Sequence, residues 1–162
     1  MVALGTHANT QGRTAGTNIA GGEASSGGVL GTAITKFQNL EIARTGLTER
    51  EAAAVGLGAF GVTTDASSRA NYYPGAQSMR IKIVAERRSG RLLGAQIVGG
   101  EGAGKRIDVL ATALWNGMTV PEMGGMDLSY APPFSPVWDL AGLGSGAAGR
   151  RQTRVEALSQ PL

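Results

Sequence analysis

Two glycines and a lysine in the middle of the chain have the spacing of a phosphate-binding loop. Gly99, Gly104 and Lys105 fit the pattern G-x-x-x-x-G-K, in which backbone N–H groups and a lysine ammonium hold nucleotide phosphates. The match ends at Arg106, which stands where a serine or threonine hydroxyl would hold magnesium. One hypothesis is therefore a nucleotide-binding protein that uses this degenerate loop. The alternative is a glycine-rich exit from a hairpin that lets the next helix fold back over a sheet.

A second candidate is a proline-rich stretch that carries aromatic rings. Three prolines within residues 132–136 fix φ and remove backbone donors, so residues 130–136 are expected to form an extended connection. Aromatic rings recur every four residues here, at Tyr130, Phe134 and Trp138. Rigid aromatic segments suit an interface or the wall of a site. A proline-rich turn packed over the chain's own core is the alternative.

Composition excludes several other kinds of chemistry. The 162 residues include no cysteine, so disulfides, thiolate metal sites and a cysteine nucleophile within this chain are excluded. The absence of cysteine is compatible with a reducing compartment. With His7 as the single histidine, a multi-histidine metal site or a Ser-His triad is not predicted. The net charge of +3 is scattered, which does not indicate nucleic-acid binding.

The same composition bears on location and size. No apolar run approaches the roughly 20 residues of a membrane span, and the start of the chain does not have the pattern of a signal peptide. We therefore expect a cytoplasmic protein without a membrane partner. The length indicates one domain with extensions.

The elements that position these candidates alternate between strands and helices. A short helix that ends near Ala20, capped by Asn9 or Thr10, precedes a glycine- and serine-rich linker. Hydrophobic alternation predicts strands over residues 29–35, 37–44, 59–64, 79–86 and 92–98, and the last two form the clearest hairpin.

Two helix starts carry capping boxes. Thr48 with Glu51, and Thr119 with Glu122, have the spacing in which each side chain bonds the other residue's backbone N–H. The first box predicts a helix over residues 48–55, and the second begins a short helix that two glycines end. Apolar spacing predicts a longer helix over residues 103–116.

With these elements placed, the chain resembles the C-terminal part of the FAD-dependent pyridine nucleotide-disulfide oxidoreductases. The resemblance is nearest to the coenzyme A-disulfide reductases and related NADH oxidases. It is carried in the family's order by residues 4–9 (LGTHAN) with 11–13 (QGR), 71–75 (NYYPG), 105–109 (KRIDV) and 130–135 (YAPPFS).

The resemblance implies an α+β fold, in which helices pack on an antiparallel sheet. By this resemblance, residues 1–28 would be the tail of an FAD-binding domain with a linker, and residues 29–145 would form a dimerisation domain. Residues 146–162, rich in small and polar types, are expected to form a disordered tail. The implied partner is a second copy of the chain or a full-length reductase subunit.

The resemblance also assigns site residues. Leu4, Gly5 and Thr6 would approach the flavin of FAD at a helix N-terminus, where amide donors and the helix dipole favour negative charge. Tyr130 would be catalytic, reaching into the disulfide-reducing site of the other subunit. A tyrosine with a pKa of about 10 is a poor base at neutral pH, so we expect it to donate a hydrogen bond to a departing thiolate. Tyr72 and Asn9 would bind substrate.

Interface packing is the alternative role for Tyr72, and we prefer it for Tyr73. In the family the redox cysteine, the first FAD glycine motif and the NAD(P)H domain would lie before Met1. The chain alone is therefore expected to have no turnover. A free-standing, non-catalytic dimerisation module remains the other hypothesis beside the nucleotide-binding one.

Overall fold

The computed structural model describes residues 4–137, 146, 148 and 149. Trp138, the last of the three spaced rings, lies outside the described residues. So does nearly all of the tail predicted for residues 146–162.

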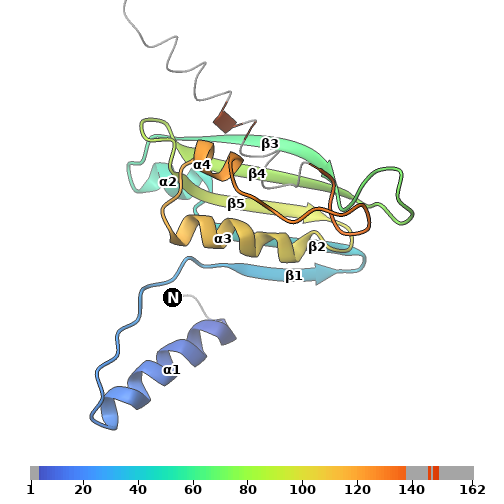
Figure 1. Ribbon diagram of the computed structural model, residues 1–162. Helices are drawn as coiled ribbons and strands as arrows, with labels where there is room; N and C mark the ends of the chain where they lie inside the picture. The colour runs from blue at the N-terminus through green and yellow to red at the C-terminus, as the bar shows by residue number, and fades with distance from the viewer. Residues whose placement is uncertain (1–3, 138–145, 147, 150–162) are drawn as a thin grey trace, which may run out of the picture.

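Five antiparallel strands form a single sheet in the order β1-β2-β5-β4-β3 (Figure 1). The strands are β1 (Ala33–Phe37), β2 (Leu40–Gly46), β3 (Ala59–Ser67), β4 (Ser78–Glu86) and β5 (Leu92–Gly99). The predicted hairpin is the β4–β5 pair at the centre of the sheet, where Ile81 faces Ile97. The predicted α+β fold, with helices on an antiparallel sheet, is confirmed.

One face of the sheet is covered by helices. A turn of 3₁₀ helix (Gly104–Arg106) leads into α3 (Ile107–Trp115), and α4 (Val120–Gly124) follows. Ile107 and Leu110 of α3 are buried against alternate residues of the central strands, chiefly Ile81, Ile83 and Ile97. Because side chains of a strand alternate between faces, this burial uses one face of β4 and β5.

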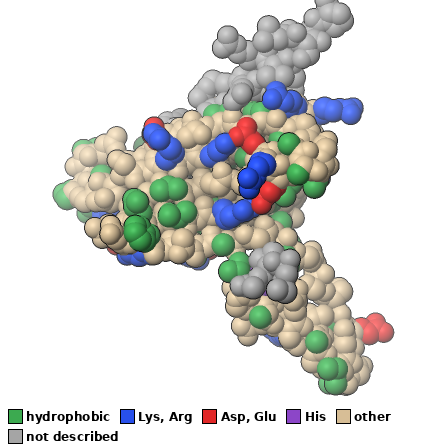
Figure 2. All heavy atoms as spheres, turned by 180° about the vertical axis from the view of Figure 1, so that it is seen from behind, with side chains coloured by type: hydrophobic (Ala, Val, Ile, Leu, Met, Phe, Trp, Pro, Cys, Tyr) green, Lys and Arg blue, Asp and Glu red, His purple; other side chains and the backbone are tan. Residues whose placement is uncertain are grey.

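Among the described residues, a helix covers the other face only at one end. There α2 (Glu49–Ala54) packs Ala52 against Val84 and Leu93. Seen from this side, basic and acidic side chains interleave beside a hydrophobic group (Figure 2). The pairs Arg44–Glu51 and Lys82–Glu49 join the sheet to α2, and Arg80–Asp65 joins β4 to β3.

The N-terminal helix is longer than predicted. Helix α1 (Gly5–Ile19) begins after Leu4, and not at Asn9 or Thr10. The reason is that the side chains of Asn9 and Thr10 bond back to the carbonyls of Gly5 and Thr6, inside the helix, and cap nothing. None of its residues is buried, and Figure 1 shows it standing apart from the sheet beyond β1.

The edge strands also differ from the prediction. The turn between β1 and β2 lies at Gln38 and Asn39, with Gln38 at a φ of 52°, and not near residue 36. Two-residue hairpin turns favour such positive φ values, but glutamine gives little sequence signal for one. Strand β3 runs three residues beyond the prediction, because Asp65 and Ser67 continue its ladder with β4 although they are polar.

Both capping boxes are confirmed. At Thr48 the hydroxyl accepts from the Glu51 N–H, and the Glu51 carboxylate accepts from the Thr48 N–H at 2.7 Å. The same reciprocal pair joins Thr119 and Glu122 at the start of α4. Glu51 also bonds Arg44 at 2.9 Å, so one carboxylate ties α2 to β2. The Thr48 backbone bond first, and then the Arg44 bond, lower the pKa of Glu51 from 4.5 to about 2.

This carboxylate makes stability depend on pH. Because the folded pKa is lowered, the stabilisation is complete above pH 4.5 and is lost as the pH falls towards 2. We expect Glu51→Gln to lower the free energy of unfolding by about 1 kcal/mol at pH 7, since the pair is partly exposed to solvent. The difference from wild type should shrink as urea melts are repeated at lower pH.

The control is Glu101→Gln, which changes an exposed glutamate in the turn after β5. It should change the urea midpoint little at any pH. A wild-type advantage over Glu51→Gln that is as large at pH 2.5 as at pH 7 would contradict the assignment.

Candidate functional site

The two tyrosines predicted to act at the site lie together at one end of the sheet. Tyr72 belongs to the loop between β3 and β4, and Tyr130 belongs to the irregular segment after α4. The two phenols lie close enough for Tyr72 to influence the pKa of Tyr130, although they are far apart in the sequence. The exposed fraction of Tyr130 is 49% and that of Tyr72 is 77%, so both rings face outward. Tyr130 is therefore not part of the chain's own core.

The segment that carries Tyr130 forms neither helix nor strand, as its prolines predict, but it is not extended throughout. A single turn interrupts it, in which the N–H groups of Phe134 and Ser135 both donate to the Ala131 carbonyl, at 2.9 and 3.0 Å. Phe134 is also exposed, at 78%. The segment is thus held by its backbone while its rings remain at the surface.

The loop that carries Tyr72 is closed at its base. Ser68 donates its N–H to the Gln77 carbonyl at 2.9 Å, and its hydroxyl accepts from the Gln77 N–H at 3.0 Å. Farther along, the Ala70 N–H donates to the Pro132 carbonyl at 3.2 Å. This last bond joins the loop directly to the Tyr130 segment.

The electrostatics of the pair favour a protonated phenol. The pKa of Tyr130 is raised above 10, first by its interaction with the hydroxyl of Tyr72 and then by burial. At neutral pH Tyr130 therefore keeps its proton and acts as a hydrogen-bond donor, not as a base.

A groove runs beside Tyr130. It has a volume of about 450 Å³ and lies between the start of α3 and the irregular segment. Apolar walls from Val109, Leu128 and Phe134 meet basic side chains from Lys105 and Arg106. A surface of this kind suits a ligand that is partly apolar and partly anionic.

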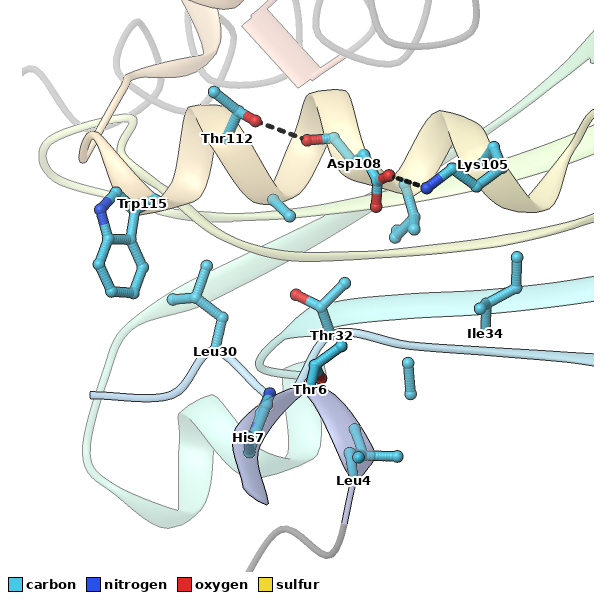
Figure 3. A pocket seen from close by; sticks show the side chains of 14 residues that line it. Leu4, Thr6, His7, Leu30, Thr32, Ile34, Lys105, Asp108, Thr112 and Trp115 are labelled. Carbon is cyan, nitrogen blue, oxygen red and sulfur yellow. Dashed lines mark hydrogen bonds and ion pairs between the residues drawn. The ribbon is translucent and has the colours of Figure 1, made fainter. Parts of the chain in front are cut away.

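The residues predicted to meet FAD line a different and larger cavity. Leu4, Gly5 and Thr6 form one wall of a space of about 900 Å³, and α3 and β1 form the opposite walls (Figure 3). The N-cap residue Leu4 makes no side-chain cap bond at the start of α1, and no acidic residue lies in the first turn of this helix. His7 adds a buried Nδ1 without a hydrogen-bond partner in the described structure. These features fit the electron-rich edge of a flavin.

Asn9 lies neither beside the two tyrosines nor in the cavity that Leu4, Gly5 and Thr6 line. Its side-chain amide donates to the Gly5 carbonyl at 2.9 Å, within α1, and it lines neither of the two cavities. The structure of one chain therefore does not bring Asn9 and Tyr72 together, because α1 and the Tyr72 loop lie at distant parts of the molecule (Figure 1).

The glycine-rich loop is engaged within the chain. The Gly104 N–H donates to a carboxylate oxygen of Glu41 at 2.8 Å. A phosphate loop needs its amides for the ligand, and a carboxylate at the same place would repel an anion. The preceding strands are the antiparallel β4–β5 hairpin, not part of a βαβ unit. The geometry is that of the predicted hairpin exit.

The described residues form neither a cluster of metal ligands nor a membrane-spanning helix. No group of three or more histidine or acidic side chains gathers there as a metal site would require. No described helix combines the length and hydrophobicity needed to cross a membrane.

Sequence reasoning missed the role of Arg106. Its guanidinium donates to the carbonyls of Ser68 and Phe134, at 2.7 and 2.8 Å, and also to that of Gly102. In the sequence it was visible only as the residue that breaks the phosphate-loop pattern. Its partners are main-chain carbonyls, which leave no signal in the sequence.

Comparison with known proteins identifies the family. Residues 32–141 match the model of the pyridine nucleotide-disulphide oxidoreductase dimerisation domain. An NAD(P)H coenzyme A polysulfide/persulfide reductase of Pyrococcus horikoshii is 46% identical over 138 residues, which are 85% of this chain and 31% of that protein. A coenzyme A disulfide reductase of Staphylococcus aureus is 38% identical over 113 residues, which are 70% of this chain and 25% of that protein.

A solved structure supports the same family assignment. An NAD-dependent persulfide reductase from A. fulgidus superposes with a TM-score of 0.88 at 41% identity, covering 94% of this chain and 28% of that one. The chain thus spans about a third or less of the length of these relatives. The matched segment is more than half of the sequence, and the chain belongs to the pyridine nucleotide-disulphide oxidoreductase family, whose dimerisation domain it contains.

Proposed function

We propose that this chain is the dimerisation part of an FAD-dependent NAD(P)H:disulfide reductase, and that Tyr130 acts in trans at the disulfide-reducing site of its partner. The observation that carries the proposal is the exposure of Tyr130 and Tyr72 on two segments that a main-chain bond from Ala70 to Pro132 joins. A phenol held at the surface by a proline-rich segment is available to another subunit, whereas a core tyrosine is not.

The substrate class follows from the relatives and from the groove. The relatives are reductases of coenzyme A persulfides or disulfides by name. Such substrates carry phosphates and a long, partly apolar arm. The groove beside Tyr130 has apolar walls that suit the arm, and the exposed ammonium of Lys105, which also pairs with Asp108, suits a phosphate. We propose a coenzyme A-type persulfide or disulfide as the substrate.

Tyr130 contributes a proton donor to the reaction. Breaking a sulfur–sulfur bond leaves negative charge on the departing sulfur, and a hydrogen bond from a neutral phenol stabilises that charge. Its raised pKa keeps the proton on Tyr130 at neutral pH. Tyr72 lies near Tyr130, and its exposed ring offers a surface for the substrate.

The proposal includes the cofactor and the domains. Residues 1–28 would complete an FAD domain, with Leu4, Gly5 and Thr6 at the pyrimidine edge of the flavin, and residues 29–145 would form the dimerisation domain. Bound FAD supplies the passage of electrons from nicotinamide to the disulfide. The redox cysteine and the NAD(P)H domain would belong to a longer polypeptide. We propose that the enzyme works in the cytoplasm.

Mixed dimers test whether Tyr130 acts in trans. One full-length subunit would carry Tyr130→Phe with its redox cysteine intact, and the other would carry Tyr130 with that cysteine replaced by serine. If Tyr130 serves the partner, one complete site forms per mixed dimer. The mixed dimer should then keep about half of the activity of the unmodified dimer. Steady-state NAD(P)H oxidation on dimers purified through two different tags measures this.

The two parent homodimers serve as controls, and both should be nearly inactive. Sedimentation must show that each preparation is a dimer. A mixed dimer as inactive as its parents would refute action in trans, since a tyrosine that serves its own subunit leaves no complete site in it.

A further inference from the structure

Arg106 lies where three parts of the chain meet. It ends the 3₁₀ turn that precedes α3, and its side chain is partly buried. One guanidinium nitrogen donates to the Ser68 carbonyl at 2.7 Å and to the Phe134 carbonyl at 2.8 Å, and the other donates to Gly102. It therefore connects the helix start, the base of the Tyr72 loop and the Tyr130 segment.

The connection to Tyr130 is short and stiff. The Phe134 carbonyl that Arg106 holds belongs to the turn in which Phe134 and Ser135 donate to the Ala131 carbonyl. Ala131 is next to Tyr130, and prolines fix φ at the two positions that follow it. Holding Phe134 therefore fixes the backbone from which Tyr130 projects.

The connection to Tyr72 runs through the loop base. Arg106 holds the carbonyl of Ser68, which is 3% exposed. Two residues later the Ala70 N–H bonds the Pro132 carbonyl, and the Ala70 carbonyl accepts from the Tyr73 N–H at 2.8 Å. The loop and the segment are thus bonded both to each other and to the same guanidinium.

We propose that Arg106 is a positioning residue for the tyrosine pair, because its planar guanidinium holds the carbonyls of both segments and so sets where the two hydroxyls lie. The role in turnover rests on the proposed function of Tyr130. Arginine suits this task because it presents five donors in a rigid fork, whereas the compact ammonium of a lysine cannot reach carbonyls from several segments at once.

The test compares Arg106→Lys with Arg88→Lys in the full 162-residue chain. Arg88 is exposed in the turn between β4 and β5, at the opposite end of the sheet, so the control makes the same substitution away from the pair. Tyrosine-ring NMR would titrate the three phenols separately. Arg106→Lys should move the pKa of Tyr130 down towards its ordinary value, as Tyr72→Phe should, because the interaction with Tyr72 that raises it is loosened.

The direction of this shift is diagnostic. Arg106→Lys keeps the positive charge, so a fall in the pKa of Tyr130 reports a change in position. A variant that lost the charge would raise the pKa of a nearby phenol. Amide exchange at Ala70 and Ser135 should also quicken about tenfold, because charge-assisted bonds that fix their segments are lost. Arg88→Lys should change neither measurement.

The full-length reductase provides the last measurement. There Arg106→Lys should lower kcat about tenfold and leave KM for NAD(P)H unchanged, since a small misplacement of a reacting group is costly. Unchanged titration and exchange in Arg106→Lys would overturn the positioning role. A shifted titration with normal turnover would uphold the positioning by Arg106 and overturn the catalytic role of Tyr130, which separates the two proposals.

Discussion

Turnover of the full-length reductase is expected to fall about 100-fold when Tyr130 is replaced by phenylalanine. The change removes one hydroxyl and keeps the ring, and the ring is half exposed, so the fold should be unaffected. The loss arises because the departing sulfur no longer receives a hydrogen bond in the transition state. Steady-state kinetics should show the loss in kcat with the disulfide substrate, while flavin reduction by NAD(P)H stays at its wild-type rate.

Tyr73→Phe is the matched control. Tyr73 lies next to Tyr72 in the same loop, and its exposed fraction is 37%. Its role is predicted to be packing, which a phenylalanine preserves, so turnover should change less than about twofold. Equal activity of Tyr130→Phe and Tyr73→Phe would remove the phenol of Tyr130 from the mechanism.

Local signals in the sequence were enough to predict much of the fold. The two capping boxes, at Thr48 and Thr119, depend only on residues three apart, and both form as predicted. The β4–β5 hairpin was readable for the same reason, because its alternation and its turn lie within one continuous stretch. Patterns of this kind need no knowledge of what packs against them.

The ends of some helices and strands could not be predicted in this way. The start of α1 was misplaced because Asn9 and Thr10, which are good caps in general, bond backwards inside the helix. The end of β3 was missed because Asp65 is polar, yet it pairs with Arg80 on the neighbouring strand at 2.6 Å. Whether a polar residue continues a strand depends on its neighbour across the sheet.

The contacts within the candidate site also could not be predicted from local patterns. The prolines predicted a connection without helix or strand and left open whether Tyr130 would be exposed, and its meeting with Tyr72 depends on main-chain bonds such as that from Ala70 to Pro132. Bonds between main-chain groups involve no particular side chain, so no residue pattern reveals them. The resemblance to a family placed the two tyrosines together, while the residue types alone did not.

The second large effect is expected on stability, when a glycine in β5 is replaced by alanine. At Gly94 a Cβ atom would lie 2.2 Å from the carbonyl oxygen and 2.5 Å from the nitrogen of Leu47. The contact is with backbone, which cannot rotate away as the end of a side chain can. Gly94→Ala should therefore force the connection between β2 and α2 away from β5.

That displacement breaks other interactions. The Leu47 N–H donates to the Leu93 carbonyl at 2.8 Å, and Leu47 also packs against the small cluster that holds α2 on the sheet. Overpacking and the lost hydrogen bond together should lower the free energy of unfolding by about 3 kcal/mol. For a chain of this size the melting temperature should fall by roughly 6–12 °C.

Gly58→Ala is the matched control, because it adds the same methyl group at an exposed glycine that has open space around its missing Cβ. Its free energy of unfolding should stay within about 0.5 kcal/mol of wild type. Both variants must be melted at one protein concentration, since the stability of the proposed dimer would depend on it. If Gly94→Ala and Gly58→Ala have the same melting temperature, Leu47 does not cross close to β5 in solution. The connection to α2 must then follow another path.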